Sequence, residues 1–223
     1  MSEQRVEAVE RALSLIEAFS AQETELSLAQ LHEATGLYKS TILRLAGSLE
    51  RYGYLVRKPS GNYRIGPSLW RLGSLYSRSF ELGDLIRPEL KVLVGATRET
   101  ASFYVQEGHD RVCLYRENSP EALRFHLDEG ARLPMERGAS AHILRAFGPD
   151  QPADLQHLRE TGFCETDSER SPQIAAIAVP VFGEHRTLRG ALALSGPSFR
   201  FEESERLAAL KLLQSAAERL RGQ

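Results

Sequence analysis

The sequence contains only two cysteines, Cys113 and Cys164, and they are far apart and form no CxxC pair. This scarcity argues against a disulfide framework and a structural zinc site. The six histidines show neither an i, i+4 pair nor an H-E-x-x-H pattern, so the usual sequence signs of a metal site are missing as well. We therefore expect no metal and no cofactor, and a reducing, cytoplasmic environment.

Long hydrophobic runs are also missing. No stretch approaches the roughly 20 apolar residues that a membrane-spanning helix requires. The longest apolar run, Ile174 to Phe182, is much shorter and predicts a buried strand. The N-terminus is acidic and polar and does not resemble a signal peptide. We expect a cytoplasmic protein without a membrane partner.

Catalytic motifs are absent too. The chain has no G-x-S-x-G elbow, no Walker-type loop and no dinucleotide-binding glycine loop. Ser140 and His142 are two residues apart, and residues at that spacing on a helix do not face each other. Cys113 is a candidate reactive thiol, but a cysteine within an apolar strand is typical of inert core. The prediction is that the protein is not an enzyme, and turnover of an ester or amide would revive the alternative of a hydrolase.

Positive charge is concentrated in one segment. The formal net charge is only −2, yet seven basic residues and one acidic residue, Glu50, lie between Leu37 and Leu72. A local excess of six in a mildly acidic chain indicates a local anionic partner. The alternative is a solvated helix face with ordinary surface cations.

The same segment predicts two helices joined by a tight turn. Ser27 is a natural N-cap for a helix over residues 26–35, and Gln30 completes a capping box. Gly36 follows where a left-handed helix end favours glycine. A second helix, residues 38–52, then begins almost at once. This arrangement is a helix-turn-helix.

The second helix has two faces at helical spacing. Its apolar face contains Tyr38, Ile42, Leu45, Ala46 and Leu49. Its opposite, polar and cationic face contains Ser40, Arg44, Gly47 and Arg51. Gly47 either permits close approach of a partner or only weakens the helix by about 1 kcal/mol. A preceding helix over residues 5–21 is expected to cover the core with Val9, Ala12, Leu13, Ile16 and Phe19.

A β-hairpin is predicted directly after these helices. Residues 54–58 and 63–65 alternate in the manner of strands, with a turn containing proline and glycine between them. Such a hairpin is a wing, and its Lys58 and Arg64 are placed to reach phosphates. Residues 68–80 predict a further helix, which is either a linker that pairs with a partner chain or the last helix of the first domain.

The rest of the chain predicts an α+β domain. The expected helices are residues 85–98, 140–147, 153–160 and 202–221. The expected strands are residues 101–106, 111–117, 122–127, 174–182 and 189–196. Consecutive strands with little helix between them favour a mostly antiparallel sheet with helices around it.

The run GLYKSTILRLAGSLERYGYLVRKPSGNYRIG resembles the winged helix-turn-helix of IclR-type transcriptional regulators. It departs from that pattern at Tyr38, where proline is usual, and at Ala46-Gly47. Three later segments resemble that family's GAF-like effector domain, in order: GARLPMERGASAHIL, ETDSE followed by IAAIAVPVF, and RGALALSGPSFRF. The resemblance implies a DNA-binding domain over residues 1–67, a linker helix over 68–83 and an effector domain over 84–223.

For the first domain, the resemblance implies contacts with double-stranded DNA. Arg44 and Ser40 are the candidates for reading bases, because arginine can pair bidentately with guanine. The remaining candidates are expected to hold phosphates and set the register. They are Lys39, Thr41, Arg51, Lys58 and Arg64.

For the second domain, the resemblance implies a pocket for a small carboxylic acid near a helix start, where backbone N–H groups favour an anion. The candidate effector-binding residues are Tyr104, Phe125, Leu133, Met135, Gly138, Ala139, Ser140, Asp167, Ala176, Ala178, Ala193 and Ser195. Ala193 stands where relatives often carry a hydroxyl, and Gly138 replaces a threonine or serine. These departures predict a less polar pocket and a larger, aromatic acid. Ordinary core or turn packing is the alternative for each residue.

The function implied is a ligand-responsive transcription factor that acts on a palindromic operator as a homodimer or homotetramer. The alternative is a small-molecule sensor or protein-interaction module whose helix-turn-helix packs only against a protein.

Overall fold

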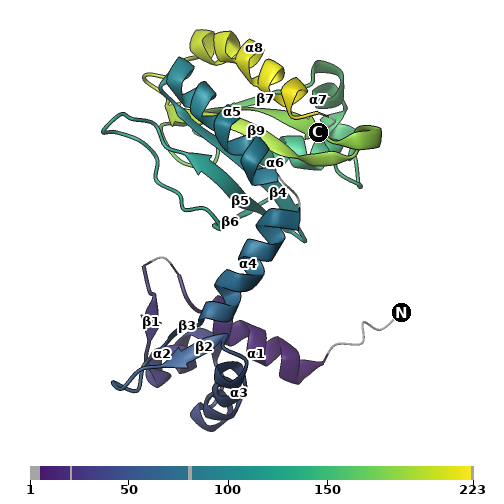
Figure 1. Ribbon diagram of the computed structural model, residues 1–223. Coiled ribbons are helices and arrows are strands. Elements are labelled where there is room, and N and C mark those ends of the chain that lie inside the picture. The colour runs from purple at the N-terminus through teal and green to yellow at the C-terminus, as the bar shows by residue number, and fades with distance from the viewer. Residues whose placement is uncertain (1–5, 21, 80–81, 222–223) are drawn as a thin grey trace. The chain divides into compact units, whose positions relative to one another are not determined.

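The computed structural model describes residues 6–20, 22–79 and 82–221 (Figure 1). The chain divides into two compact units, Met1–Phe80 and Glu81–Gln223. The first consists mostly of helices with one small sheet, and the second contains a larger antiparallel sheet with helices on both faces. The α+β class predicted from the sequence is confirmed.

The first unit follows the predicted order of elements, with one short strand added. Its elements are α1 (Glu7–Glu17), β1 (Glu25–Leu26), α2 (Leu28–Thr35), α3 (Lys39–Arg51), β2 (Leu55–Arg57), β3 (Tyr63–Ile65) and α4 (Pro67–Ser79). The three strands form an antiparallel sheet in the order β1-β3-β2. Helix α4 was predicted to continue to Phe80, which lies outside the described residues.

The turn between α2 and α3 is built as its residues predict. Ser27 and Gln30 form both hydrogen bonds of a capping box at the start of α2. Gly36 ends the helix with φ of 69°, in the left-handed region that favours glycine. Only Leu37 and Tyr38 then separate it from α3, which begins at Lys39. A helix-turn-helix is therefore present.

The core of the first unit corrects two expectations. Tyr38 is 80% exposed instead of buried. It precedes the first helical residue of α3, so helical spacing does not apply to it. On α1, Val9 and Leu13 are exposed and Leu15 is fully buried. The core-facing stripe of α1 is therefore Ala12, Leu15 and Ile16. Together with Phe19 beyond the end of the helix, these residues pack with Leu31, Ile42, Ala46, Leu55 and Tyr63.

The second unit is a single antiparallel sheet with helices on both faces. Its helices are α5 (Leu82–Thr97), α6 (Ala139–Phe147), α7 (Gln156–Thr161) and α8 (Glu203–Arg219), with short 3-10 turns η1 (Ala153–Leu155) and η2 (Glu184–Arg186). Its strands are β4 (Thr100–Glu107), β5 (Asp110–Glu117), β6 (Arg132–Pro134), β7 (Cys164–Asp167), β8 (Ile174–Phe182) and β9 (Leu188–Pro197). They lie in the order β6-β5-β4-β9-β8-β7.

One strand was predicted at the wrong place, and one strand was not predicted. Residues 122–127 form no strand, and the short strand β6 pairs with β5 ten residues later instead. The Phe125 carbonyl accepts a hydrogen bond of 2.6 Å from Arg116 Nη2, so a side chain holds this loop. Strand β7 was not predicted, because its sequence, CETD, is short and largely polar.

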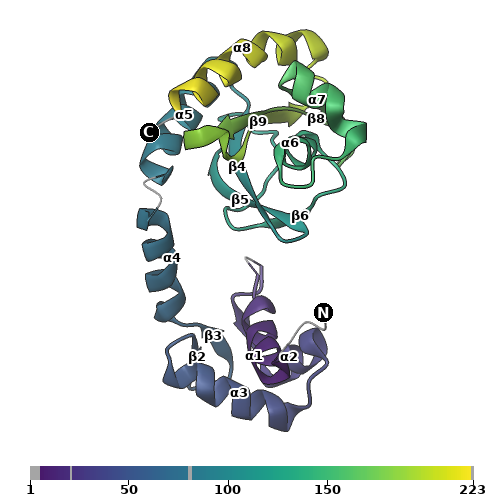
Figure 2. The same ribbon diagram turned by 90° about the vertical axis from the view of Figure 1, so that its right-hand side faces the viewer.

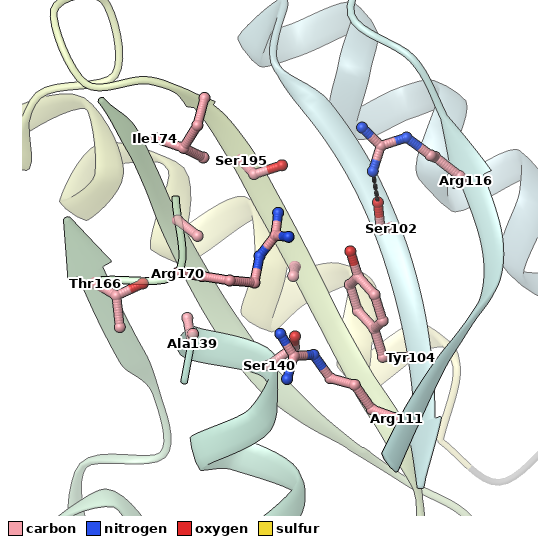
Figure 3. A pocket seen from close by; sticks show the side chains of 13 residues that line it. Ser102, Tyr104, Arg111, Arg116, Ala139, Ser140, Thr166, Arg170, Ile174 and Ser195 are labelled. Atoms are coloured by element: carbon pink, nitrogen blue, oxygen red, sulfur yellow. Dashed lines mark hydrogen bonds between the residues drawn. The ribbon is translucent and has the colours of Figure 1, made fainter. Parts of the chain in front are cut away.

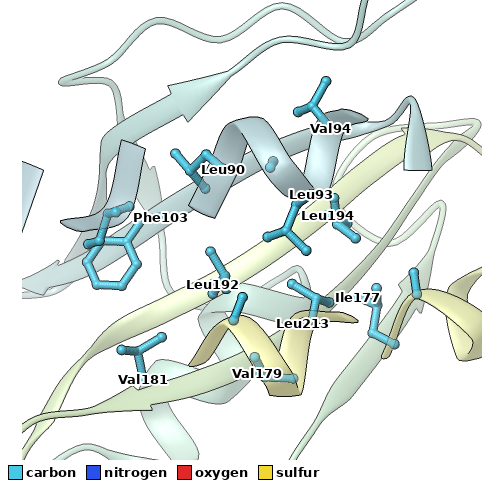
Figure 4. Close-up of a cluster of buried hydrophobic side chains, with 14 of the residues drawn as sticks. Leu90, Leu93, Val94, Phe103, Ile177, Val179, Val181, Leu192, Leu194 and Leu213 are labelled. Atoms are coloured by element: carbon cyan, nitrogen blue, oxygen red, sulfur yellow. The ribbon is translucent and has the colours of Figure 1, made fainter. Parts of the chain in front are cut away.

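Each face of the sheet carries a separate apolar cluster. Helices α5 and α8 cover one face (Figure 2). There, Leu90, Leu93 and Leu213 pack on the strand residues Phe103, Ile177, Val179, Leu192 and Leu194 (Figure 4). Helix α6 lies on the opposite face, where smaller residues such as Ala178, Ala191 and Ala193 leave more room. The candidate effector cavity lies on that second face.

No helix among the described residues is long and apolar enough to cross a membrane.

Candidate functional site

The outer face of α3 is polar and cationic. Ser40, Arg44 and Arg51 are exposed, whereas Ile42, Ala46 and Leu49 on the other side of the helix are buried. Within the described part of the chain, neither Arg44 nor Arg51 forms an ion pair with a carboxylate. Their charges are therefore available to an external anion. Lys39 is also exposed, and Thr41 is half-buried.

Of the two wing cations predicted to reach phosphates, one is engaged and one is open. Lys58 donates a hydrogen bond of 2.9 Å to Glu25 of β1, whose other carboxylate oxygen accepts one from Asn62 Nδ2. The hydrogen bond from Lys58 holds the pKa of Glu25 below its ordinary value. Arg64 is exposed on β3. Lys58 can thus meet a phosphate only in competition with Glu25.

Gly47 occupies open space on the outer face of α3. A Cβ built on it would meet no heavy atom within 4 Å. Nothing within the described unit therefore requires glycine at this position.

A cavity of about 500 Å³, part of it at the open mouth, lies between the sheet and α6 (Figure 3). The space that the centre of a water-sized molecule can occupy is about 40 Å³. Its wall contains seven of the predicted effector residues, namely Tyr104, Gly138, Ala139, Ser140, Ala176, Ala193 and Ser195. The wall also contains Ser102, Arg111, Arg116, Thr166, Arg170 and Ile174, which the sequence did not single out.

Five predicted effector residues lie elsewhere. Asp167 is on the opposite face of β7, where it accepts hydrogen bonds from Ser168 and Ser198 and approaches Arg206 of α8. Leu133, Met135 and Ala178 belong to the apolar cluster beside the cavity and not to its wall. Phe125 stacks against Arg170, with 4.4 Å from the guanidinium carbon to the ring centre. Its side chain does not belong to the cavity wall.

A β-bulge determines which side chains of β5 reach the cavity. Phe103 pairs with Tyr115, but the next residue, Tyr104, pairs with Cys113, so Leu114 is an extra residue in β5. Side chains alternate along a regular strand, and one extra residue reverses the alternation beyond it. Arg111 and Arg116, which are an odd number of positions apart, therefore both face the cavity.

The guanidinium groups of Arg111, Arg116 and Arg170 contact neutral groups. Arg116 donates to Asn118 Oδ1, to Ser102 Oγ and to the Phe125 carbonyl. Arg111 donates to the Pro134 carbonyl, and its Nε has no hydrogen-bond partner in the described structure. Together with Arg170, they form no ion pair with any carboxylate among the described residues. The wall of this pocket is therefore cationic, which the replacements at Gly138 and Ala193 did not indicate.

Burial lowers the pKa values of two of these arginines. Arg111 is 1% exposed. Loss of water lowers its pKa below the ordinary value, and the charge of Arg170 lowers it further. Burial likewise lowers the pKa of Arg170. Burial raises the pKa of the Tyr104 hydroxyl, which keeps that ring neutral beside the cations.

The start of α6 adds backbone donors to this wall. Gly138 adopts φ of 99°, which side-chain-bearing residues rarely do, and a Cβ there would lie 3.2 Å from Arg111 Nη2 and 3.7 Å from Arg170 Cδ. The Gly138 N–H donates to Glu169, which also contacts His142 Nε2 at 2.8 Å. The next two N–H groups, of Ala139 and Ser140, have no intrahelical partner because they belong to the first turn.

The other candidate chemistries find no support in the geometry. No group of three or more metal-ligating side chains occurs among the described residues. Cys113 and Cys164 are both buried, and burial raises the pKa of Cys164 to about 12 and also that of Cys113. Neither thiol is therefore activated as a nucleophile.

Sequence comparison identifies both units. The profile of the IclR helix-turn-helix domain matches residues 8–59, and that of the bacterial transcriptional regulator IclR C-terminal domain matches residues 152–221. The DNA-binding transcriptional repressor YiaJ of Escherichia coli K12 is 30% identical, over 93% of this chain and 84% of the relative. This chain belongs to the IclR family of transcriptional regulators.

Other members are more distant in sequence. The regulator XynR of Escherichia coli K12 is 26% identical over 95% of this chain and 94% of its own length. A solved IclR regulator from Silicibacter sp. TM1040 superposes with a TM-score of 0.83 at 24% identity, over 97% of both chains. An IclR homologue from Microbacterium hydrocarbonoxydans, solved with 4-hydroxybenzoate, has a TM-score of 0.80 at 21% identity, over 96% of this chain and 97% of that one. These structural likenesses concern the fold.

Proposed function

We propose that this IclR-family regulator inserts α3 into the major groove of a palindromic operator and places its wing on the neighbouring backbone. The observation that carries the proposal is the exposed outer face of α3, where Arg44 and Arg51 lack carboxylate partners among the described residues. Arg44 and Ser40 read bases, and Lys39, Thr41, Arg51, Lys58 and Arg64 hold phosphates.

A palindromic operator requires two copies of the reading unit. One small winged domain makes few contacts, so a homodimer or homotetramer supplies the affinity. The exposed apolar side chains of α4, Trp70 among them at 80% exposure, support a contact between chains.

The cavity of the second unit binds the effector, a small organic acid. The start of α6, Arg111 and Arg170 offer donors and positive charge to a carboxylate. The homologue solved with 4-hydroxybenzoate supports an acid as the class of ligand. The acid changes DNA binding only through different affinity for the arrangements of the DNA-binding units. No substrate turnover is expected.

The test combines operator selection with a salt titration. Duplexes selected from a randomised pool are bound by the full chain, and anisotropy is followed between low and moderate salt. We expect a linear fall of log affinity with log salt, at a slope that reflects several phosphate contacts. A chain that flows through heparin and duplex DNA at low salt would overturn the proposal and favour a module that binds proteins.

A further inference from the structure

The charge of the effector cavity goes beyond what one carboxylate would neutralise. Three guanidinium groups line it, and no aspartate or glutamate does so. The hydrogen bonds of Arg111 and Arg116 to carbonyl, hydroxyl and amide oxygens satisfy some of their donors but leave the charges uncompensated. Buried charges are costly unless an opposite charge accompanies them. The cavity wall therefore carries an excess of positive charge.

An acidic side chain beside the cavity, Glu169, is already engaged. Glu169 accepts from the Gly138 N–H and contacts His142 Nε2, and it does not belong to the cavity wall. It attracts Arg111 weakly enough that the pKa of Arg111 is still lowered overall by burial. No carboxylate among the described residues belongs to the cavity wall or forms an ion pair with its three guanidinium groups, so the wall itself stays positive.

The cations are spread along the cavity and not gathered at one point. Arg116 Nη1 is held by Ser102 at 3.1 Å, and the Arg111 guanidinium carbon lies 5.8 Å from the centre of the Tyr104 ring. Ser102 and Tyr104 are two residues apart on β4, which is about 7 Å along a strand. Arg170 reaches in from the β7–β8 side, opposite β5 (Figure 3).

We infer that the effector is a small organic acid with at least two anionic groups, one at the Arg111 and Arg170 end near the start of α6 and one toward Arg116. This inference rests on the proposed role of the cavity and narrows its ligand class. Ser140, Thr166 and Ser195 lie on the same wall and supply neutral donors to the ligand oxygens. Opposite charges in a partly desolvated cavity attract more strongly than in water.

The test uses pairs of acids that share a carbon skeleton and differ by one charge. 3-Methylbenzoate is compared with isophthalate, 4-methylbenzoate with terephthalate, and butanoate with succinate, by titration calorimetry on the full chain at one pH and one ionic strength. We expect at least one dianion to bind about tenfold more tightly than its monoanionic counterpart, which corresponds to about 1.4 kcal/mol.

Two variants distinguish binding inside the cavity from nonspecific electrostatic attraction between the protein and a dianion. Arg170→Gln lies in a loop outside the paired strands, so it should fold, and we expect it to lower the dianion-to-monoanion affinity ratio severalfold. Arg137→Gln removes the same charge from an exposed residue outside the cavity wall and should preserve the ratio.

The outcomes distinguish the two proposals. A ratio near one in the unmodified chain, or an unchanged ratio in Arg170→Gln, would overturn the inference while leaving an acid-binding cavity in place. Failure of every monoanion and dianion to bind would overturn the cavity's proposed role as well.

Discussion

Arg111 and Arg116 are five positions apart on β5 and yet both face the cavity, because Leu114 bulges out of the pairing with β4. A regular strand would direct one of them toward α5 and α8. The bulge thus places two cations on the face that α6 covers, Arg111 beside Gly138 at the start of that helix and Arg116 beside Ser102. Predictions for both units follow from such local arrangements.

The role of Arg44 can be tested by truncation. Arg44→Ala should lower affinity for the selected operator by about 1–3 kcal/mol at the matching base pair and relax specificity there. Thermal stability should not change, because the side chain is exposed and forms no ion pair among the described residues. Lys91→Ala, an equal charge change on an exposed residue of α5, is the control. Wild-type discrimination between operator and scrambled duplex in Arg44→Ala would contradict the role.

The ion pair on the wing predicts a gain of binding. Glu25→Gln removes the carboxylate that holds Lys58, so Lys58 becomes free to contact a phosphate. We expect tighter DNA binding and a log–log salt slope that is steeper by up to about one. Glu23→Gln makes the same charge change at an exposed neighbour and should leave the slope unaltered. An equal effect of both variants would assign the gain to net charge alone.

Gly47 predicts opposite effects on stability and binding. Gly47→Ala should stabilise α3 by up to about 1 kcal/mol, because a Cβ meets open space in the free protein. If the glycine serves close approach to DNA, the variant should bind the operator more weakly despite its stability. Gly95→Ala on α5, also without neighbours within 4 Å, is the matched control for binding. Unchanged operator affinity would show that Gly47 does not serve close approach to DNA and only lowers the stability of α3.

The buried thiols predict slow alkylation and a stability that falls in alkali. Burial raises the pKa of Cys164 to about 12 and also raises that of Cys113, whereas an unfolded cysteine ionises near about 8.5. The stabilising contribution is fully present below the unfolded pKa and is lost as pH rises through the folded one. At pH 8.5, iodoacetamide should modify the native protein more than about tenfold more slowly than the protein in urea, as read by mass spectrometry. Equal rates would show that the two thiols are accessible.

Local signals in the sequence predicted much of the fold. The Ser27 capping box and Gly36 place the turn, and the apolar run from Ile174 to Phe182 matches β8 at both ends. These features depend on neighbouring residues alone. The predicted apolar stripe of α1 was partly wrong, because Leu15 lies in the core and Leu13 is exposed. Several spacings of apolar residues are compatible with an amphipathic helix, so the sequence alone did not decide between them.

The cavity was predictable only in part. Residues on the start of α6 and on β8 and β9 could be placed by resemblance, and their side chains line the cavity. The arginines could not, because strict alternation separates Arg111 from Arg116 and only pairing with β4 creates the bulge at Leu114. Arg170 lies in a loop whose course depends on β7, a strand too short and polar to be recognised.

Strand β1 also limits how the DNA-binding unit can be divided. Leu26 is buried in its core, and β1 pairs with β3 on the far side of the helix-turn-helix in sequence. A peptide cut just before α2 would keep both helices of the motif but lose the outer strand and the Glu25 anchor of the hairpin. The smallest fragment able to present α3 together with an ordered wing must therefore include β1, which ends just before the motif begins at α2.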